Sequence, residues 1–261
     1  HKELNNPRKV NPNDAMQGSY LGPSYEQRTI EKELTAYGAK FSSVTEDEMI
    51  NQTAQALAGS KAIGWFQDRM EFGPRSLGGR SILGDPRSEQ MQKTLNLKVK
   101  YRESFRPFAP SILREDVNEW FEADYDSPYM LLVDNVKKDK RIEMTKEEES
   151  LFGIDKLNIK RSSIPAITHV DYSARIQTVH KETNPKFYAL ITKFKEITDC
   201  SVLVNTSFNV RGEPIVCTPV DAFRCFMGTD LDLLVIGNCI LRKDLQDSSL
   251  IEDYKDKYEL D

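Results

Sequence analysis

The chain has 261 residues, of which 39% are hydrophobic and 30% charged, a composition that suits one large soluble domain or two small ones. It contains no apolar run near the ~20 residues of a membrane span, and no signal peptide is recognisable, so we expect a cytoplasmic protein without a membrane partner. Four cysteines without CxxC spacing and three histidines argue against a disulfide framework, a zinc site and a multi-histidine metal centre.

The net charge of -5 argues against a nucleic-acid-binding protein, but the charge is unevenly distributed. Residues 61–114 hold eleven basic and five acidic side chains, whereas the rest of the chain holds twenty-five basic and thirty-six acidic ones. A basic, glycine-containing segment in an acidic protein predicts a local site for an anion.

Alternating helix and strand patterns predict an α/β (α+β) domain with a mixed sheet. Predicted helices cover residues 24–37, 45–57, 87–97, 117–121, 184–198 and 219–228. Predicted strands cover residues 39–44, 61–66, 108–113, 165–179, 201–205, 231–236 and 238–241. Thr45 as N-cap with Glu48 three residues later forms a capping box, and Pro219 suits the first helical position. We expect an irregular linker over residues 1–27, an exposed loop over 134–163 and a charged tail after Arg242.

The first candidate segment, residues 69–80, is dense in arginine and glycine and follows a predicted strand. Gly78 and Gly79 allow backbone N–H groups to approach a ligand, while Arg75 and Arg80 offer planar donors that match phosphate or carboxylate oxygens. The segment is neither a Walker A loop nor a GxGxxG motif. The alternative interpretation is a structural turn with solvated arginines.

In the second segment, Lys98, Lys100, Arg102 and Arg106 recur at even spacing. In an extended chain these cations line one side, and an anion would relieve their mutual repulsion. Aromatic side chains between and beside them either stack on a base or pack into the core: Tyr101, Phe105 and Phe108. The strip favours a polyanionic small ligand such as a nucleotide.

The third segment begins where an apolar strand ends in polar side chains, among them Asn205, Ser207, Asn209 and Arg211. Polar groups at the carboxyl end of a buried strand are typical of a ligand crevice, although Asn and Ser are also ordinary turn residues. Arg175 joins this group only if its strand is a neighbour. His169 is interpreted as a structural histidine more readily than as a general acid or base, and Cys217 and Cys225 as core residues.

Three longer motifs resemble the O-carbamoyltransferase family of nodulation and antibiotic biosynthesis. They are EFGPRSLGGRSIL (71–83), KYRESFRPFAP (100–110) and NTSFNVRGEPIV (205–216). The resemblance spans roughly residues 20–242 and covers only the C-terminal part of the family.

The resemblance implies a YrdC-like domain over residues 28–242, with a twisted mixed sheet, surrounding helices and a basic cavity. Such a domain forms carbamoyl adenylate from carbamoyl phosphate and ATP, with Mg²⁺ accompanying ATP. An N-terminal actin-like or sugar-kinase-like domain, absent here, then transfers the carbamoyl group to a hydroxyl of a small-molecule acceptor. That domain holds the family's iron-type metal. Residues 1–27 are then a linker from it, residues 243–261 a tail, and a homodimer is one assembly to consider.

Carried over by motif, phosphate binding is expected from Arg75, Lys100, Arg106 and Arg175, and carbamoyl or nucleotide binding from Asn205 and Ser207. Lys100, Arg106 and Arg75 are expected to stabilise the transferring phosphoryl group. Additional binding candidates are Arg80, Arg102, Asn209 and Arg211. Two alternatives stay open: an RNA-binding module that uses the same basic cavity, and a non-catalytic docking domain.

Overall fold

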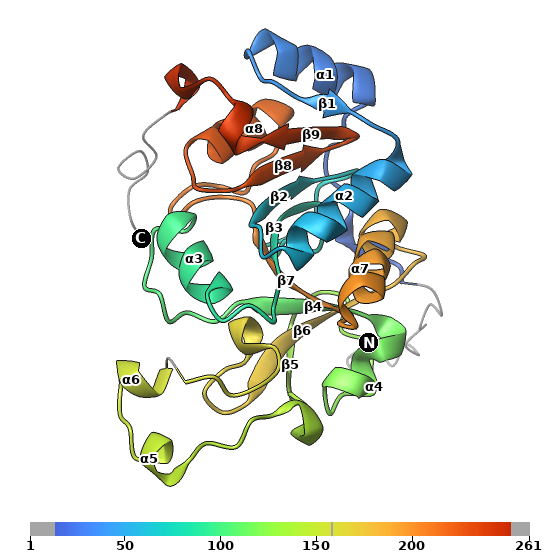
Figure 1. Cartoon of the computed structure of the whole chain (residues 1–261). Helices are drawn as coiled ribbons and strands as arrows, with labels where there is room; N and C mark the ends of the chain where they lie inside the picture. The colour runs from blue at the N-terminus through green and yellow to red at the C-terminus, as the bar shows by residue number, and fades with distance from the viewer. Residues whose placement is uncertain (1–13, 158, 252–261) are drawn as a thin grey trace, which may run out of the picture.

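The protein is described by a computed structural model over residues 14–157 and 159–251, in which nine strands form one mixed sheet (Figure 1). The strand order is β1-β9-β8-β2-β3-β7-β4-β6-β5. The strands are β1 (Ser42–Ser43), β2 (Ile63–Phe66), β3 (Arg80–Gly84), β4 (Ala109–Leu113), β5 (Leu132–Asn135), β6 (Ser173–Val179), β7 (Val202–Ser207), β8 (Leu233–Ile236) and β9 (Cys239–Arg242). The β2–β8 and β4–β6 pairs are parallel and the other neighbours antiparallel, which confirms the predicted α/β class with a mixed sheet.

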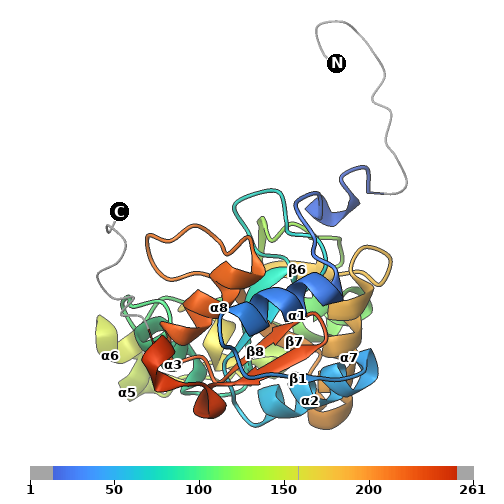
Figure 2. The same cartoon turned by 90° about the horizontal axis from the view of Figure 1, so that it is seen from above.

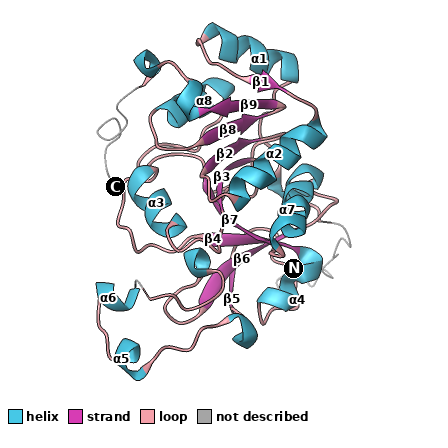
Figure 3. Cartoon of the chain, viewed as in Figure 1, coloured by secondary structure: helices cyan, strands magenta, loops and turns pink. Residues whose placement is uncertain are grey.

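The helices cover both faces of this sheet. They are α1 (Gln27–Ala36), α2 (Glu46–Ala58), α3 (Met91–Lys98), α4 (Val117–Trp120), α5 (Lys146–Glu149), α6 (Ile154–Leu157), α7 (Pro185–Thr198) and α8 (Pro219–Met227). Helix α2 packs against α7 on one face, and α1 packs against α8 on the other (Figures 1 and 2). The segment with α5 and α6 is mostly loop and extends beyond β5 and β6 (Figure 3). The predicted exposed loop over residues 134–163 therefore contains two short helices and the end of β5.

Local sequence explains where the main helices begin. Thr45 accepts a hydrogen bond from the Glu48 N–H at 3.3 Å, and the Glu48 carboxylate accepts one from the Thr45 N–H at 3.0 Å. The predicted capping box of α2 is therefore confirmed. Thr218 and Asp221 form the same arrangement at the start of α8, where Pro219 occupies the first turn.

Two strands were not predicted, and one of them is central. Strand β3 lies between β2 and β7 and is buried at all five positions, although its sequence RSILG contains only two large apolar side chains. Strand β5 forms the sheet edge and is largely exposed. Because β3 is an interior strand, residues 76–80 at the end of the glycine- and arginine-rich segment are buried, whereas residues 72–75 remain exposed.

The predicted extended strip of cations is wrong. Lys98 ends helix α3, and residues 99–107 form no strand. The chain turns at Tyr101, whose φ of 48° lies in the left-handed region. Phe108 packs in the core, whereas the Tyr101 hydroxyl donates to the Gly228 carbonyl at 2.8 Å. The turn separates Lys98 from the other cations of the strip.

The described part of the predicted linker lies against the body of the protein. The Tyr20 hydroxyl donates to the Leu77 carbonyl at 2.6 Å, and the Gly22 N–H donates to the Met70 carbonyl at 2.9 Å. Residues 1–13 of the linker and 252–261 of the tail are outside the described residues, whereas residues 243–251 include two short 3-10 turns. Among the described residues, no helix has the length and apolar character needed to cross a bilayer.

Candidate active site

The arginine- and glycine-rich loop is held in place by a buried carboxylate. Glu71 Oε1 accepts from three backbone N–H groups, those of Leu77, Gly79 and Arg80, at 2.7, 2.6 and 3.2 Å. Gly78 has a φ of +107°, and a Cβ at this position would lie 2.3 Å from the Phe187 ring. Only glycine combines this backbone conformation with this close approach, so the loop conformation is specified by its sequence.

The smaller of two adjoining cavities, the Arg175 cavity, has a volume of about 160 Å³ and lies at the carboxyl end of β7, beside the first residues of β4 and β6. Asn205 and Ser207 reach it from the carboxyl end of β7, and Arg175 reaches it from β6. Strand β4 lies between β6 and β7, so the two strands are not direct neighbours, yet Arg175 still joins the group. Its complete lining is Pro74, Arg75, Ser76, Arg102, Pro107, Phe108, Ala109, Met130, Arg175, Asn205, Thr206 and Ser207.

The larger cavity, the Lys100 cavity, has a volume of about 410 Å³. Its walls are the turn after β7 and the loop after α3. Its complete lining is Lys100, Arg102, Arg106, Ser207, Asn209, Val210, Arg211, Gly212, Glu213 and Pro214. Arg102 and Ser207 line both cavities, so they stand at the junction between them.

Positive charge dominates these two cavities. Six cationic side chains line them together: Arg75, Lys100, Arg102, Arg106, Arg175 and Arg211. Burial lowers the pKa of Arg102 to about 10 and also lowers the pKa of Arg175, to which the charge of Arg75 adds. Arg106 repels Arg102, and Arg75 repels Arg175, so a bound anion would relieve like-charge repulsion in both cavities.

Lys100 lies at the wall of its cavity with its ammonium bonded to the chain. Its Nζ donates to the Ser207 carbonyl and to the carbonyl and side-chain oxygens of Asn209, both at 2.7 Å. Burial lowers the pKa of Lys100 to about 7. The lysine therefore holds the Ser207–Asn209 turn in place at the edge of the cavity. Arg106 forms a 2.9 Å ion pair with Glu103, and both of these side chains are exposed to solvent.

Arg80 is placed elsewhere, and the ligand-binding role predicted for it requires correction. It is fully buried and its guanidinium lies 3.5 Å from the centroid of the Phe66 ring. It donates to four backbone carbonyls, those of Pro23, Gln67, Asp68 and Gly79. Because β3 begins at Arg80 in the middle of the sheet, the guanidinium donates its hydrogen bonds to the surrounding backbone and does not face either basic cavity.

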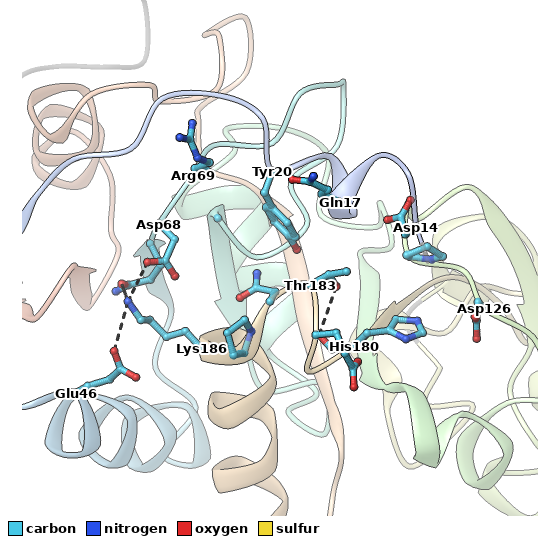
Figure 4. Close-up of a pocket in the computed structure, with 16 residues that line it drawn as sticks. Asp14, Gln17, Tyr20, Glu46, Asp68, Arg69, Asp126, His180, Thr183 and Lys186 are labelled. Atoms are coloured by element: carbon cyan, nitrogen blue, oxygen red, sulfur yellow. Dashed lines mark hydrogen bonds and ion pairs between the residues drawn. The ribbon is translucent and has the colours of Figure 1, made fainter. Parts of the chain in front are cut away.

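A third cavity was not predicted. The His180 cavity has a volume of about 1000 Å³ and contains residues from the N-terminal segment, the end of β2 and the start of α7 (Figure 4). Five carboxylates line it against two basic side chains, and Lys186 already pairs with Asp68 at 3.1 Å and Glu46 at 3.6 Å. Its lining comes from separated segments without a common motif, so periodicity and spacing gave no signal for it.

Among the described residues, no three or more His, Cys, Asp or Glu side chains lie close enough together to hold a metal ion. His169 lies outside both basic cavities, has its pKa lowered by burial, and is 3.3 Å from the Ser173 hydroxyl. These observations favour the structural interpretation of His169 over an acid–base role.

Comparison with known proteins identifies relatives over most of the chain. An uncharacterized protein of Synechocystis is 56% identical over 100% of this chain and 43% of its own length. Nodulation protein NolO of Bradyrhizobium diazoefficiens is 39% identical over 92% of this chain and 41% of its own length. The 3'-hydroxymethylcephem-O-carbamoyltransferase of Streptomyces clavuligerus is 32% identical over 78% of this chain and 34% of its own length. The chain thus spans about two fifths or less of these relatives.

A solved structure of full-length HypF, in its phosphate- and nucleotide-bound form, resembles the chain with a TM-score of 0.49 and 17% identity, covering 76% of this chain and 22% of that one. The family model described as carbamoyltransferase C-terminus matches residues 54–243, which include the glycine-rich loop and both basic cavities. The chain therefore belongs to the carbamoyltransferase family and corresponds to the C-terminal part of its members.

Proposed function

We propose that this chain binds carbamoyl phosphate in the Arg175 cavity and ATP in the Lys100 cavity, and that it forms carbamoyl adenylate from them. The observation that carries the proposal is the junction: Arg102 and Ser207 line both cavities. Two phosphorylated ligands bound side by side would meet there. A volume of about 160 Å³ suits the smaller ligand, and the wider cavity of about 410 Å³ suits part of a nucleotide.

The reaction balances with one water molecule. Water cleaves carbamoyl phosphate into carbamate and inorganic phosphate, and a carbamate oxygen then attacks the α-phosphorus of ATP. The bond from this phosphorus to the bridging oxygen breaks, and pyrophosphate leaves. The negative charge on the transferring phosphoryl oxygens develops near fixed arginines, which is where preorganised cations lower a barrier most effectively.

Other parts of the activity belong to the same proposal. Mg²⁺ would enter with ATP and be held by its phosphates, since the described residues offer no carboxylate cluster for it. Transfer to the hydroxyl of a small-molecule acceptor would need the part of the protein that the relatives carry beyond this chain, including any iron-type metal. The confinement of the arginines to two small cavities supports small phosphorylated ligands over RNA.

The direct test is release of pyrophosphate from ATP by the isolated chain in the presence of Mg²⁺. Release that depends on carbamoyl phosphate is expected, together with calorimetric binding of both ligands. A chain that binds neither carbamoyl phosphate nor ATP would contradict the proposal. Binding without turnover would limit the proposal to ligand recognition and overturn its catalytic part.

Lys100 gives the proposed ATP site a measurable pH dependence. Its pKa of about 7 means that the lysine is largely neutral at pH 8, and a polyphosphate beside it favours the charged form. ATP binding at pH 8 is therefore expected to take up protons, and affinity should fall as pH rises from 7 towards 10. Calorimetry in two buffers of different ionisation enthalpy measures the uptake.

The matched variant for this measurement is Lys100→Arg, which stays charged over the whole range. Its binding enthalpy should not depend on the buffer. If the wild-type chain takes up no protons, or the variant takes up as many, Lys100 does not titrate with nucleotide binding.

A further inference from the structure

Three buried polar side chains form a network at the Arg175 cavity. Ser111, Gln177 and Asn205 lie on the neighbouring strands β4, β6 and β7, and each is 2% exposed or less. Gln177 Oε1 accepts from the Ser111 hydroxyl at 2.5 Å and from Asn205 Nδ2 at 2.9 Å. Of the three, only Asn205 lines the cavity itself, so the other two act on a ligand through Asn205.

A backbone carbonyl determines the orientation of the Gln177 amide. The terminal atom of this side chain that lies 2.7 Å from the Leu77 carbonyl oxygen must be the nitrogen, because a carbonyl only accepts hydrogen bonds. The Gln177 oxygen is therefore the atom that faces Asn205. Because this oxygen only accepts hydrogen bonds, the atom of the Asn205 amide that contacts it must be the nitrogen, Nδ2.

The carbonyl of Ser76, in the same loop as Leu77, fixes the Asn205 amide in the same orientation. Asn205 Nδ2 lies 3.2 Å from the Ser76 carbonyl oxygen, which also requires a donor. Since the nitrogen of the Asn205 amide makes both of these contacts, the Asn205 oxygen Oδ1 points away from the Ser76 carbonyl and the Gln177 oxygen. It is buried and has no hydrogen-bond partner among the described residues. Arg175, on the same cavity, has a buried Nε that also lacks a partner there.

We propose that Asn205 Oδ1 accepts a hydrogen bond from the amino group of carbamoyl phosphate, and that Gln177 is the positioning residue that keeps this atom an acceptor. The inference rests on the proposed function and adds a specificity to it. Acetyl phosphate has the same shape, but a methyl group replaces the amino group and leaves Oδ1 unpaired. A site built around a substrate N–H discriminates strongly against an analogue that lacks it.

Calorimetry of the wild-type chain with carbamoyl phosphate, acetyl phosphate and inorganic phosphate tests the acceptor. Carbamoyl phosphate is expected to bind roughly 10- to 100-fold more tightly than acetyl phosphate, the range that one unpaired buried acceptor implies. Equal affinity for the two acyl phosphates would overturn the inference and leave the proposed function standing. No binding of carbamoyl phosphate would overturn both.

Gln177→Met tests the positioning role, with Ser111→Ala as the matched control. The methionine has similar volume but no oxygen to orient Asn205. The amide is then held only by the Ser76 carbonyl at 3.2 Å and by the Ser111 hydroxyl, which can donate as well as accept. The preference for carbamoyl over acetyl phosphate should therefore fall by about threefold or more. Affinity for inorganic phosphate should persist, since the arginines are intact. Ser111→Ala removes the hydroxyl that accepts from Asn205 Nδ2 at 2.9 Å but keeps the Gln177–Asn205 bond and the Ser76 contact, so it should keep the preference.

The outcomes separate positioning from general damage to the fold. Loss of preference in both variants, or in neither, would overturn the role of Gln177. Thermal unfolding of each variant shows whether it is folded. Should Gln177→Met not fold, Gln177→Asn shortens the side chain, withdraws its oxygen from Asn205 and is expected to give the same loss.

Discussion

Replacing Arg80 with methionine is expected to lower the free energy of unfolding by about 3–5 kcal/mol, because the substitution leaves two buried and two partly buried carbonyls without their donor. The stacking of the guanidinium 3.5 Å from the centroid of the Phe66 ring is lost as well. Chemical denaturation monitored by tryptophan fluorescence measures the change, since Trp65 is buried in the adjacent strand β2.

The matched variant is Arg75→Met, five residues earlier in the same loop. Arg75 is exposed and lines the Arg175 cavity, so this change should leave stability within about 0.5 kcal/mol and weaken binding of carbamoyl phosphate. A stable Arg80→Met protein with weakened ligand binding would restore the role that the sequence predicted for Arg80 and contradict the structural one.

These two arginines show where sequence reasoning reaches its limit. Both lie in one motif, and both have the side chain that suits an anion. What separates them is strand β3, which begins at Arg80 and lies between β2 and β7. The strand has too few apolar residues to be recognised by its pattern, because its burial comes from neighbours on both sides. Burial of an individual arginine depends on such tertiary packing, which periodicity does not report.

Elements with local signals were predictable. The capping box of Thr45 and Glu48 and the proline at the start of α8 act within one turn of chain, so the sequence contains all that defines them. The cations after α3 were predicted to gather for the wrong reason. They do not alternate along a strand; the loop that turns at Tyr101 brings Lys100, Arg102 and Arg106 to one cavity.

The orientation of the Asn205 amide could not be predicted from the sequence. The motif predicted Asn205 as the last residue of a buried strand, whereas β7 continues two residues further, to Ser207. Which end of the Asn205 amide meets the cavity depends on carbonyls of Ser76 and Leu77, more than a hundred residues earlier, and on Gln177 two strands away. Gln177 itself stood in the predicted strand without any feature that distinguished it from a core polar residue.

Replacing Arg102 with alanine is expected to weaken binding of both carbamoyl phosphate and ATP, each by roughly 10- to 100-fold, the range for one hydrogen bond to a charged group. Arg102 lines both cavities, so one side chain serves both ligands. Its Nε donates to Asn96 at 2.7 Å and its guanidinium lies 5.0 Å from the centroid of the Phe108 ring. These contacts hold the guanidinium at the junction, so little side-chain entropy is lost when a ligand binds.

Two matched variants isolate the junction from the loss of charge. Arg175 lines only the smaller of the two cavities, so Arg175→Ala should weaken the binding of carbamoyl phosphate and leave the binding of ATP nearly unchanged. Arg211 lines only the larger one, so Arg211→Ala should show the reverse. Titration of each variant with each ligand gives the comparison. If Arg102→Ala weakens the binding of only one ligand, the two cavities bind their ligands independently, and the proposal that adenylation occurs at their junction is wrong. If it affects both while the two flanking variants stay selective, Arg102 stands where the two phosphorylated ligands meet, which is the position that transfer between them requires.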